Sequence, residues 1–289
     1  MKHVLRPKLS VSEAAAILDR AKGHVAVITG AGVSTESGIP DYRGPTGRYT
    51  QTTSKPMTHQ EFMGHVNNRK RFWSRALIGF KSFEEAHPNR SHKALAKLEE
   101  RGLIKGVITQ NVDRLHHRAG TKEVVELHGR GDTLECMTCG SVKSRREYQQ
   151  ELMEENKLWL SFMDGKKYTL TADGDAIIED SDLGSFCVLN CDVCSVGILK
   201  PAYVFFGGTV PPDVAQKAHE LSVTSKAVFV IGTTSSTFSC YRLIRAAHQQ
   251  GSPVLLVNRG PTRVDDMVAG VFDDASCGEF LEELVECTK

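Results

Sequence analysis

The chain has 289 residues, 40% of them hydrophobic, so it is long enough to bury one large core or two modest ones. Its 36 basic and 35 acidic residues nearly cancel, and no long run of one sign occurs, which argues against a nucleic-acid-binding surface. No apolar stretch approaches the roughly 18 residues that a membrane-spanning helix requires, so we expect no membrane association.

The predicted elements alternate between helices and strands along most of the chain. Amphipathic periodicity and helix-end signals predict helices over residues 14–22, 68–83, 91–101, 241–250 and 280–287. Short β-branched runs predict buried strands over residues 25–29, 106–109, 124–127, 227–231 and 253–257. Ser10 and Glu13 have the spacing of a capping box before the first helix, and Ser91 is expected to cap the third. The aromatic stripe of the second helix favours a packed core.

The strand over 25–29 runs into Gly30-Ala31-Gly32, and Ser34 follows. A strand that ends at two glycines is typical of a phosphate-binding turn, although an ordinary tight turn has the same pattern. The dehydrogenase fingerprint is not met, because its third glycine and the acid that binds the ribose hydroxyls are both missing. Residues 36–44 mix Gly, Pro, Asp and Arg, which predicts a loop folded over a ligand.

Polar or glycine residues follow each of the five predicted strands. In open parallel sheets, ligands bind beyond the carboxyl ends of the strands. We therefore expect one site, lined by the loops after residues 29, 109, 127, 231 and 257.

The chain contains eight cysteines and no secretory signal, which favours reduced thiols or metal ligands over disulfides. The basic start, MKHVLRPKLS, is typical of a short tail or of the remnant of an organelle-targeting peptide. Two Cys-x2-Cys pairs predict a closed structural zinc site, with a disulfide or free thiols as the alternatives; the ligands would be Cys136, Cys139, Cys191 and Cys194. Cys187 competes as a ligand, but the x2 spacing favours Cys191.

An ordered set of motifs resembles the sirtuin family of NAD-dependent protein deacylases. The resemblance covers roughly residues 10–287, and its motifs are GAGVS and GIPDYR over 30–43, TQNVD over 109–113, ELHG over 126–129 and the two cysteine pairs. Residues 71–75, 88–92 and 260–263 look most like the class II branch, to which the mammalian mitochondrial sirtuin four belongs.

The resemblance implies an α/β fold in which helices cover both faces of a Rossmann-like parallel sheet, with a small zinc-binding and helical domain. The NAD-binding domain would comprise residues 1–44, 86–130 and 200–289, and the small domain residues 45–85 and 131–199. The implied activity is removal of an acyl group from lysine, which enters between the domains. The acyl oxygen attacks NAD, nicotinamide leaves, and water releases lysine and O-acyl-ADP-ribose.

The resemblance also implies the site residues. His128 would be the general base, which suits an imidazole because its pKa lies near neutrality; Asn111 and Asp113 would line the nicotinamide pocket and complete the catalytic set. The expected NAD contacts are Gly30, Ala31, Gly32, Ser34, Pro40, Asp41, Tyr42, Arg43, Gln110, Asn111, Val112, Asp113, Gly232, Thr233, Thr234, Asn258, Arg259, Gly260 and Cys277.

Some residues depart from the family pattern. Ala202 and Gly208 stand where acidic residues are usual on a substrate-facing strand, and residues 234–238 are more polar than the usual serine-leucine-glutamine-valine. These departures concern substrate handling and catalytic rate more than NAD binding. The tyrosine and arginine pair of the desuccinylase branch is not found, and the insertion near 158–185 is where a loop would reach the acyl channel.

Two alternatives to a deacylase remain open: a protein mono-ADP-ribosyltransferase and an NAD-binding regulatory module with weak turnover. We expect acylated lysine side chains of proteins as partners, neither nucleic acid nor membrane, and a monomer. NAD is the expected cosubstrate and one structural Zn²⁺ the expected metal. The resemblance implies the mitochondrial matrix in a eukaryote and the cytoplasm in a bacterium.

Overall fold

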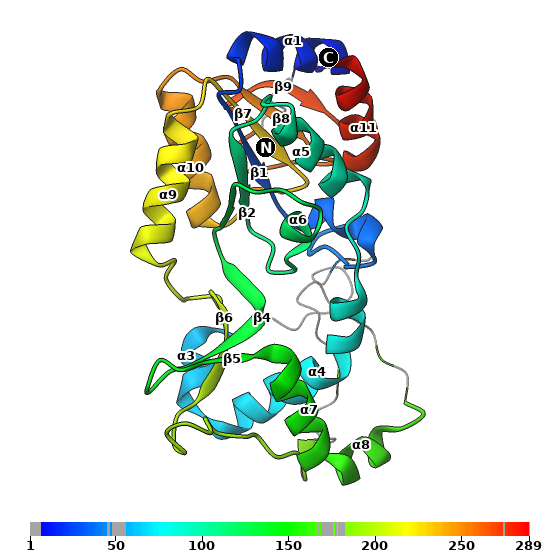
Figure 1. Cartoon of the computed structure of the whole chain (residues 1–289), viewed down its shortest axis with the longest axis vertical. Coiled ribbons are helices and arrows are strands. Elements are labelled where there is room, and N and C mark those ends of the chain that lie inside the picture. The colour runs from blue at the N-terminus through cyan, green and yellow to red at the C-terminus, as the bar shows by residue number, and fades with distance from the viewer. Residues whose placement is uncertain are drawn as a thin grey trace. The chain divides into compact units, whose positions relative to one another are not determined.

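The computed structural model describes residues 7–44, 47, 56–166, 168, 176, 178, 183–273 and 275–288. The chain divides into two units (Figure 1). The first unit comprises Met1–Gly38, His87–His128 and Val210–Lys289, and the second comprises Ile39–Ala86 and Gly129–Thr209. Among the described residues, no helix is both long and apolar enough to cross a lipid bilayer.

A parallel sheet forms the centre of the first unit. Its described strands are β1 (Val25–Thr29), β2 (Gly106–Thr109), β3 (Val124–Glu126), β7 (Ala227–Ile231), β8 (Val254–Val257) and β9 (Val268–Phe272). They lie in the order β3-β2-β1-β7-β8-β9, and every pairing is parallel. The five predicted strands are confirmed within a residue or so at their ends. The sequence missed β9, a short segment interrupted by Gly270.

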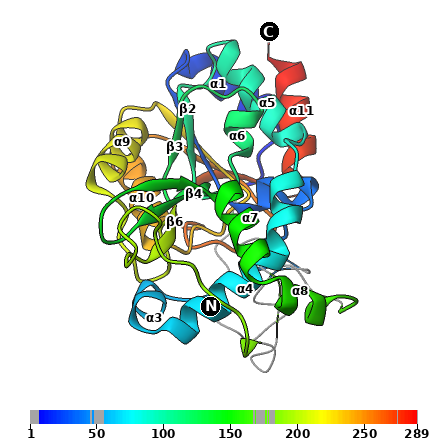
Figure 2. The same cartoon turned by 60° about the horizontal axis from the view of Figure 1, so that its bottom comes forward.

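Helices cover both faces of this sheet (Figures 1 and 2). The described helices of the first unit are α1 (Val11–Ala21), α5 (Arg90–Glu100), α6 (Leu115–Arg118), α9 (Pro212–Val223), α10 (Phe238–Gln249) and α11 (Cys277–Cys287). Because successive strand residues point to opposite faces, β1 is buried on both. Val25 and Val27 pack with α1, α5 and α11, whereas Ala26 and Ile28 pack with α9 and α10. The predicted α/β class is therefore confirmed.

Helix starts are where the sequence prediction was least accurate. The capping box of Ser10 and Glu13 is present. The prediction that Ser91 caps α5 is wrong: Asn89 is the cap, and its Oδ1 accepts a hydrogen bond from the Ser91 N–H at 2.8 Å. Helix α10 begins three residues earlier than predicted, after Thr237.

The second unit combines helices with a small antiparallel sheet. Its described elements are α3 (His59–Gly64), α4 (Val66–Glu85), α7 (Arg145–Glu155), α8 (Lys157–Met163), β4 (Gly129–Cys136), β5 (Val142–Ser144) and β6 (Leu199–Tyr203). The strands lie in the order β5-β4-β6. Phe72 and Trp73 of α4 are buried in its core, with Trp73 against Tyr148 at 4.7 Å between ring centroids. The aromatic stripe predicted over 68–83 is thus core.

Candidate functional site

The five predicted strand ends lie along one edge of the parallel sheet, because backbone hydrogen bonds continue the strand pairing into the loops. Gly30 N donates to Ile231 O at 3.2 Å and Gln110 N donates to Thr29 O at 3.0 Å. The same pattern links Leu127 to Thr109, Gly232 to Val257 and Asn258 to Phe272. The strand order reverses between β1 and β7, the position where open α/β sheets bind ligands. The loops after β1 and β7 therefore form the centre of the candidate site.

The glycine turn after β1 is needed for contact between these two loops. A Cβ at Gly32 would lie 2.8 Å from Gly232 O, and one at Gly30 would lie 2.6 Å from Thr233 Cβ. Gly232 itself has a φ of 62°, where a side chain is strained. Short 3-10 turns, η1 (Ala31–Val33) and η2 (Thr35–Ser37), follow instead of an α-helix. The glycines thus serve the close packing of the loops after β1 and β7, and the residues directly after Gly30 form 3-10 turns.

Asn111 contacts both the glycine turn and Ser34, and Asp113 contacts Ser34. Asn111 Nδ2 donates to Gly30 O at 3.1 Å and to Ser34 Oγ at 3.0 Å, and Ser34 Oγ donates to Asp113 Oδ2 at 2.7 Å. The second Asp113 oxygen accepts from the Leu115 N–H at 2.9 Å. Burial raises the pKa of Asp113, while these two hydrogen bonds lower it. Val112 lies between the two polar residues of this loop.

His128 ends the segment that follows β3. Its Nδ1 lies 3.2 Å from Gln110 O, and its Nε2 lies 2.9 Å from Ser239 Oγ. Burial lowers the pKa of His128 to about 4, although the Gln110 carbonyl acts in the opposite direction. The ring is therefore neutral at physiological pH. Sequence reasoning selected His128 but not Ser239.

The Gln110 side chain is held at both ends of its amide. Its Nε2 donates to Thr233 Oγ1 at 2.9 Å, and its Oε1 accepts from Thr237 Oγ1 at 3.0 Å. Gln110 therefore joins the loop after β2 to the loop after β7.

The loop after β8 carries further predicted residues. Asn258 Nδ2 donates to Arg259 O at 2.8 Å, and Arg259 and Gly260 are exposed. Cys277 starts α11, and its Sγ lies 3.9 Å from Val257 O at the end of β8. Burial raises the pKa of the Cys277 thiol to about 12, so the thiol stays protonated.

Four predicted NAD contacts, Pro40 to Arg43, belong to the second unit. Asp41 Oδ1 accepts a hydrogen bond from the Gly44 N–H at 2.6 Å. Residues 45, 46 and 48–55, predicted to be polar and turn-rich, lie outside the described residues.

A buried histidine pair lies beneath the site, and sequence reasoning missed it. The His92 and His116 rings are 4.8 Å apart between centroids. His116 Nε2 is 3.0 Å from Thr29 Oγ1, and His92 Nε2 is 3.5 Å from Ser34 Oγ. Burial lowers the pKa of His92 to about 4 and that of His116 well below its usual value. Both rings are therefore neutral.

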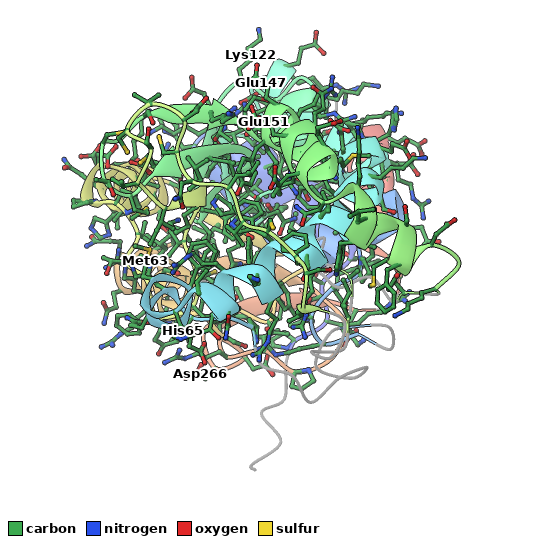
Figure 3. The ribbon with its side chains drawn as sticks, turned by 90° about the horizontal axis from the view of Figure 1, so that it is seen from below. Met63, His65, Lys122, Glu147, Glu151 and Asp266 are labelled. Carbon is green, nitrogen blue, oxygen red and sulfur yellow. The ribbon has the colours of Figure 1, made fainter. Side chains whose placement is uncertain are left out.

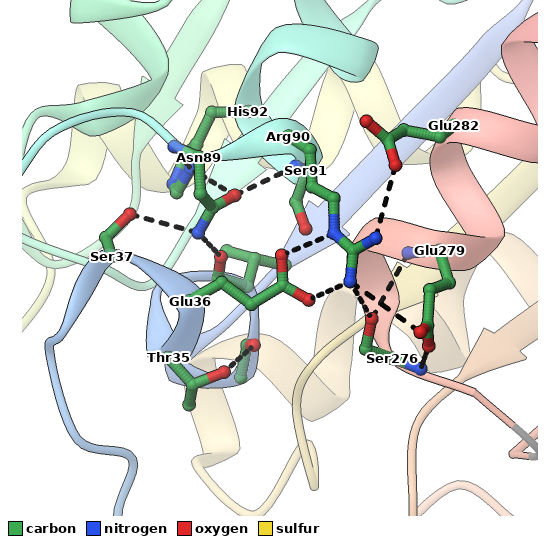
Figure 4. A network of polar contacts seen from close by, with 12 residues as sticks. Thr35, Glu36, Ser37, Asn89, Arg90, Ser91, His92, Ser276, Glu279 and Glu282 are labelled. Atoms are coloured by element: carbon green, nitrogen blue, oxygen red, sulfur yellow. Dashed lines mark hydrogen bonds and ion pairs between the residues drawn. The ribbon is translucent and has the colours of Figure 1, made fainter.

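The N-terminus of α5 holds the segment that carries Ser34 (Figure 4). Asn89 Nδ2 donates to Val33 O at 2.8 Å and to Ser37 Oγ at 3.0 Å. Arg90 binds both carboxylate oxygens of Glu36, at 2.8 and 3.0 Å. The same guanidinium reaches α11, where it contacts Glu282 at 3.2 Å and Ser276 at 3.1 Å.

The second unit brings together the four cysteines predicted as metal ligands. Their Sγ atoms lie within 4.8 Å of one another; the residues are Cys136, Cys139, Cys191 and Cys194. Two opposite Sγ pairs are 3.7 and 3.8 Å apart. A tetrahedral ion with Zn–S bonds of about 2.3 Å holds its thiolates about 3.8 Å apart. The donor set and its spacing therefore fit one structural Zn²⁺, and Cys187 lies outside the cluster.

The surroundings of the cysteine cluster fix its shape. Gly197 packs so closely that a Cβ there would collide with Cys136 Sγ. Lys143 on β5 pairs with Glu151 at 2.7 Å and with Asp192 at 2.9 Å, which joins α7 to the second cysteine pair. Figure 3 labels Glu151 on α7, one turn after Glu147.

The six-stranded parallel order, the polar loops at its carboxyl edge and the four-cysteine cluster define an α/β protein with a nucleotide-type site and a structural metal module. Residues 30–239 match the Sir2 family, and the chain belongs to that family. It is 42% identical over 245 residues to the NAD-dependent protein deacylase SIR4 of Monosiga brevicollis, covering 84% of this chain and 78% of the relative.

A bacterial relative and two solved structures agree with this assignment. The NAD-dependent protein deacetylase 1 of Streptomyces coelicolor is 44% identical over 243 residues, which cover 84% of this chain and 79% of the relative. A Sir2 complex with a p53 peptide and NAD⁺ has a TM-score of 0.73 and 29% identity, over 96% of this chain and 98% of the other. Sir2Tm bound to a propionylated peptide covers the same shares, with a TM-score of 0.72 and 29% identity.

Proposed function

We propose that this protein is an NAD-dependent protein lysine deacylase that transfers an acyl group from lysine to the ADP-ribose part of NAD. The observation that carries the proposal is the position of the His128 ring. Its ring lies at the carboxyl edge of the parallel sheet, with Nδ1 facing the Gln110 carbonyl. Membership of the Sir2 family and the names of the relatives, protein deacetylases and deacylases, support the same activity.

His128 is the proposed general base. Because a carbonyl oxygen only accepts hydrogen bonds, the contact with Gln110 O assigns the proton to Nδ1. Nε2 then keeps a lone pair that can take a proton from a hydroxyl of the nicotinamide ribose. The low pKa of His128 keeps this nitrogen unprotonated at neutral pH.

The Ser34, Asn111 and Asp113 group is proposed to hold the nicotinamide end. The Asn111 amide and the Asp113 carboxyl offer the donor and acceptor groups that a carboxamide requires. Bound NAD supplies the acceptor for the acyl group and releases nicotinamide. The glycine turns around Gly30 and Gly232 are proposed to lie along the phosphates.

The adenosine half is proposed to contact the loops after β7 and β8, with backbone groups near Cys277. The proposed NAD contacts there are Gly232, Thr233, Thr234, Asn258, Arg259, Gly260 and Cys277. Residues Pro40 to Arg43 are also proposed NAD contacts. These assignments follow the motifs that the chain shares with the family.

We propose that the first unit is the NAD-binding domain and that the second is the small helical and zinc domain. A set of four cysteine ligands leaves no open coordination position, so the metal is proposed to stabilise folding. A monomeric state and a location in the mitochondrial matrix or the bacterial cytoplasm remain predictions. The class II resemblance and the similarity to SIR4 are reasons to test several acyl groups on lysine as substrates.

An acyl-peptide array incubated with and without NAD tests the proposal. The expected result is nicotinamide release that requires both NAD and an acyl-lysine peptide, from acetyl to glutaryl-type and long-chain groups. Absence of acyl-dependent release across the array would contradict it. Label transferred from NAD to protein without deacylation, and lost in His128→Ala, would favour mono-ADP-ribosyl transfer instead.

A further inference from the structure

Three hydroxyl groups from one short segment contact Gln110 and His128. Thr233, Thr237 and Ser239 lie between the end of β7 and the first turn of α10, and we refer to them as the hydroxyl clamp. Thr233 Oγ1 and Thr237 Oγ1 bind the two ends of the Gln110 amide, at 2.9 and 3.0 Å. Ser239 Oγ lies 2.9 Å from His128 Nε2. One segment therefore holds both the base and the residue whose carbonyl orients it.

Thr237 contributes to this clamp instead of capping its own helix. It is the N-cap residue of α10, and an N-cap threonine usually accepts a hydrogen bond from a backbone N–H of the first turn. No side-chain capping bond is present here, and the hydroxyl donates to Gln110 Oε1. The first turn of α10 gives up that stabilisation for a contact with the site.

The Ser239 contact is defined by the tautomer of His128. Since Gln110 O only accepts, the imidazole proton lies on Nδ1 and the Nε2 lone pair faces Ser239. Ser239 O–H therefore donates to Nε2. A ribose hydroxyl offers the same donor to the same lone pair.

We propose that Ser239 is a positioning residue for His128: it binds the lone pair of the base in the free protein and is replaced by a cosubstrate hydroxyl. Thr237 is the matching positioning residue for Gln110. This inference rests on the proposed function, because it takes His128 as the base. It places two residues in the site that the motifs did not select.

Several titratable groups on the neighbouring elements have contacts other than His128. Asp113 binds Ser34, and His116 contacts Thr29. On the side of α10, the Arg263 guanidinium lies 4.1 Å from the Tyr241 ring. The Cys240 thiol is buried, which raises its pKa to about 12. The causes of the lowered His128 pKa, burial and the Gln110 carbonyl, include no titratable side chain, so the ionisation of another group does not mask an effect of Ser239.

An NMR titration of His128 in the free, zinc-loaded protein tests the Ser239 contact without any activity. An O–H donor to Nε2 stabilises the neutral ring, so Ser239→Ala should raise the pKa of His128 by up to about one pH unit. Ser239→Thr keeps the hydroxyl and should restore the original value. Ser236→Ala is the matched control, because the Ser236 hydroxyl contacts Thr234 and not His128. An unchanged pKa in Ser239→Ala would overturn the inference.

Kinetics separate this inference from the proposed function. In Ser239→Ala, the acid limb of kcat/KM for NAD should move to higher pH by the same amount as the NMR titration. Thr237→Val should raise KM for NAD several-fold and leave the acid limb in place, with Thr237→Ser restoring KM.

If wild type shows no acyl-dependent turnover, the proposed function fails. If wild type is active and neither variant differs from it, the positioning roles fail while the function stands.

Discussion

The polar edge of the parallel sheet and the four-cysteine cluster are held together in different ways. At the sheet edge, backbone bonds and side-chain bonds already fix Ser34, Gln110 and His128 in the protein alone. In the cluster, Cys136 and Cys194 face each other at 3.7 Å, and thiols are only weak hydrogen-bond donors. The edge is therefore preorganised by the fold, whereas the cluster is proposed to be stabilised by a bound metal.

This difference predicts separate failure modes. Loss of the metal should damage the second unit first, because binding free energy and folding free energy are the same quantity in such modules. Changes at the sheet edge should affect chemistry or pH dependence and leave the metal bound. Four experiments test this separation, in order of expected effect.

Cys191→Ser should have the largest effect. Structural zinc sites contribute on the order of 10 kcal/mol to folding, so the variant should lose metal and much of the structure of the second unit. Metal content by mass spectrometry and thermal unfolding measure the two effects. Cys187→Ser is the matched control, because Cys187 is exposed and lies outside the cluster. Full zinc content in Cys191→Ser would contradict the assignment.

His128→Ala should reduce kcat/KM by about 10²- to 10⁴-fold, the usual contribution of a general base, with little change in zinc content. Steady-state deacylation kinetics and metal analysis measure both. His219→Ala removes an exposed imidazole on α9 and should match wild type. Comparable activity in both variants would exclude His128 as the base.

Acidification should destabilise the first unit through its buried histidines. Above pH 6.5 His92 is neutral in both states; below it, the unfolded chain takes up a proton while folded His92 stays neutral down to about pH 4. Stability should therefore fall between pH 6.5 and 4, by about 3 kcal/mol for His92. Asp113, whose pKa is raised, acts in the opposite sense.

Urea unfolding as a function of pH measures this loss, and His92→Gln provides the comparison. Glutamine at this position can keep the capping box with Asn89, but it has no proton to gain in this range. The variant should be less sensitive to acid than wild type. An identical pH dependence would show that His92 does not contribute.

Variants of Asn89 should give the smallest effect on stability. They separate the contribution of the helix cap from that of the bonds to Val33 and Ser37. Asn89→Ala removes both the cap of α5 and the bonds to Val33 and Ser37, and should cost about 1 kcal/mol in unfolding free energy. Asn89→Asp keeps the cap acceptor and loses only the donors. Asn89→Asp should retain most of the stability, which denaturation measures, and should raise KM for NAD, which kinetics measures. Equal stability loss in both variants would show that the cap is not the source.

The sequence predicted the strands and the cysteine cluster well because their signals are local. Strand β1 is buried on both faces and reads as a continuous apolar run, and the x2 spacing marks the cysteine pairs. The role of Gly30 and Gly32 was only half predicted. Their position at the turn was right, but their close contact with Gly232 depends on which strand lies beside β1.

The hydroxyl clamp shows why the rest could not be predicted. Thr237 and Ser239 meet Gln110 and His128 only because the sheet places β7 beside β1, and a single sequence carries no signal for that neighbour. The polar residues over 234–238 therefore looked like a departure that concerned catalytic rate. In the structure, Thr237 uses its hydroxyl to hold Gln110. His92 and His116 were missed for the same reason.

The pairing of β1 with β7 has a consequence for synthesis on the ribosome. Val25 pairs with Ala227, about 200 residues later in the chain, so this contact closes late and slowly. Until β7 emerges, β1 is an edge strand with the apolar sequence VAVIT and unpaired backbone groups. The nascent chain therefore carries an aggregation-prone edge through the synthesis of the second unit, and chaperone binding to that edge would protect it.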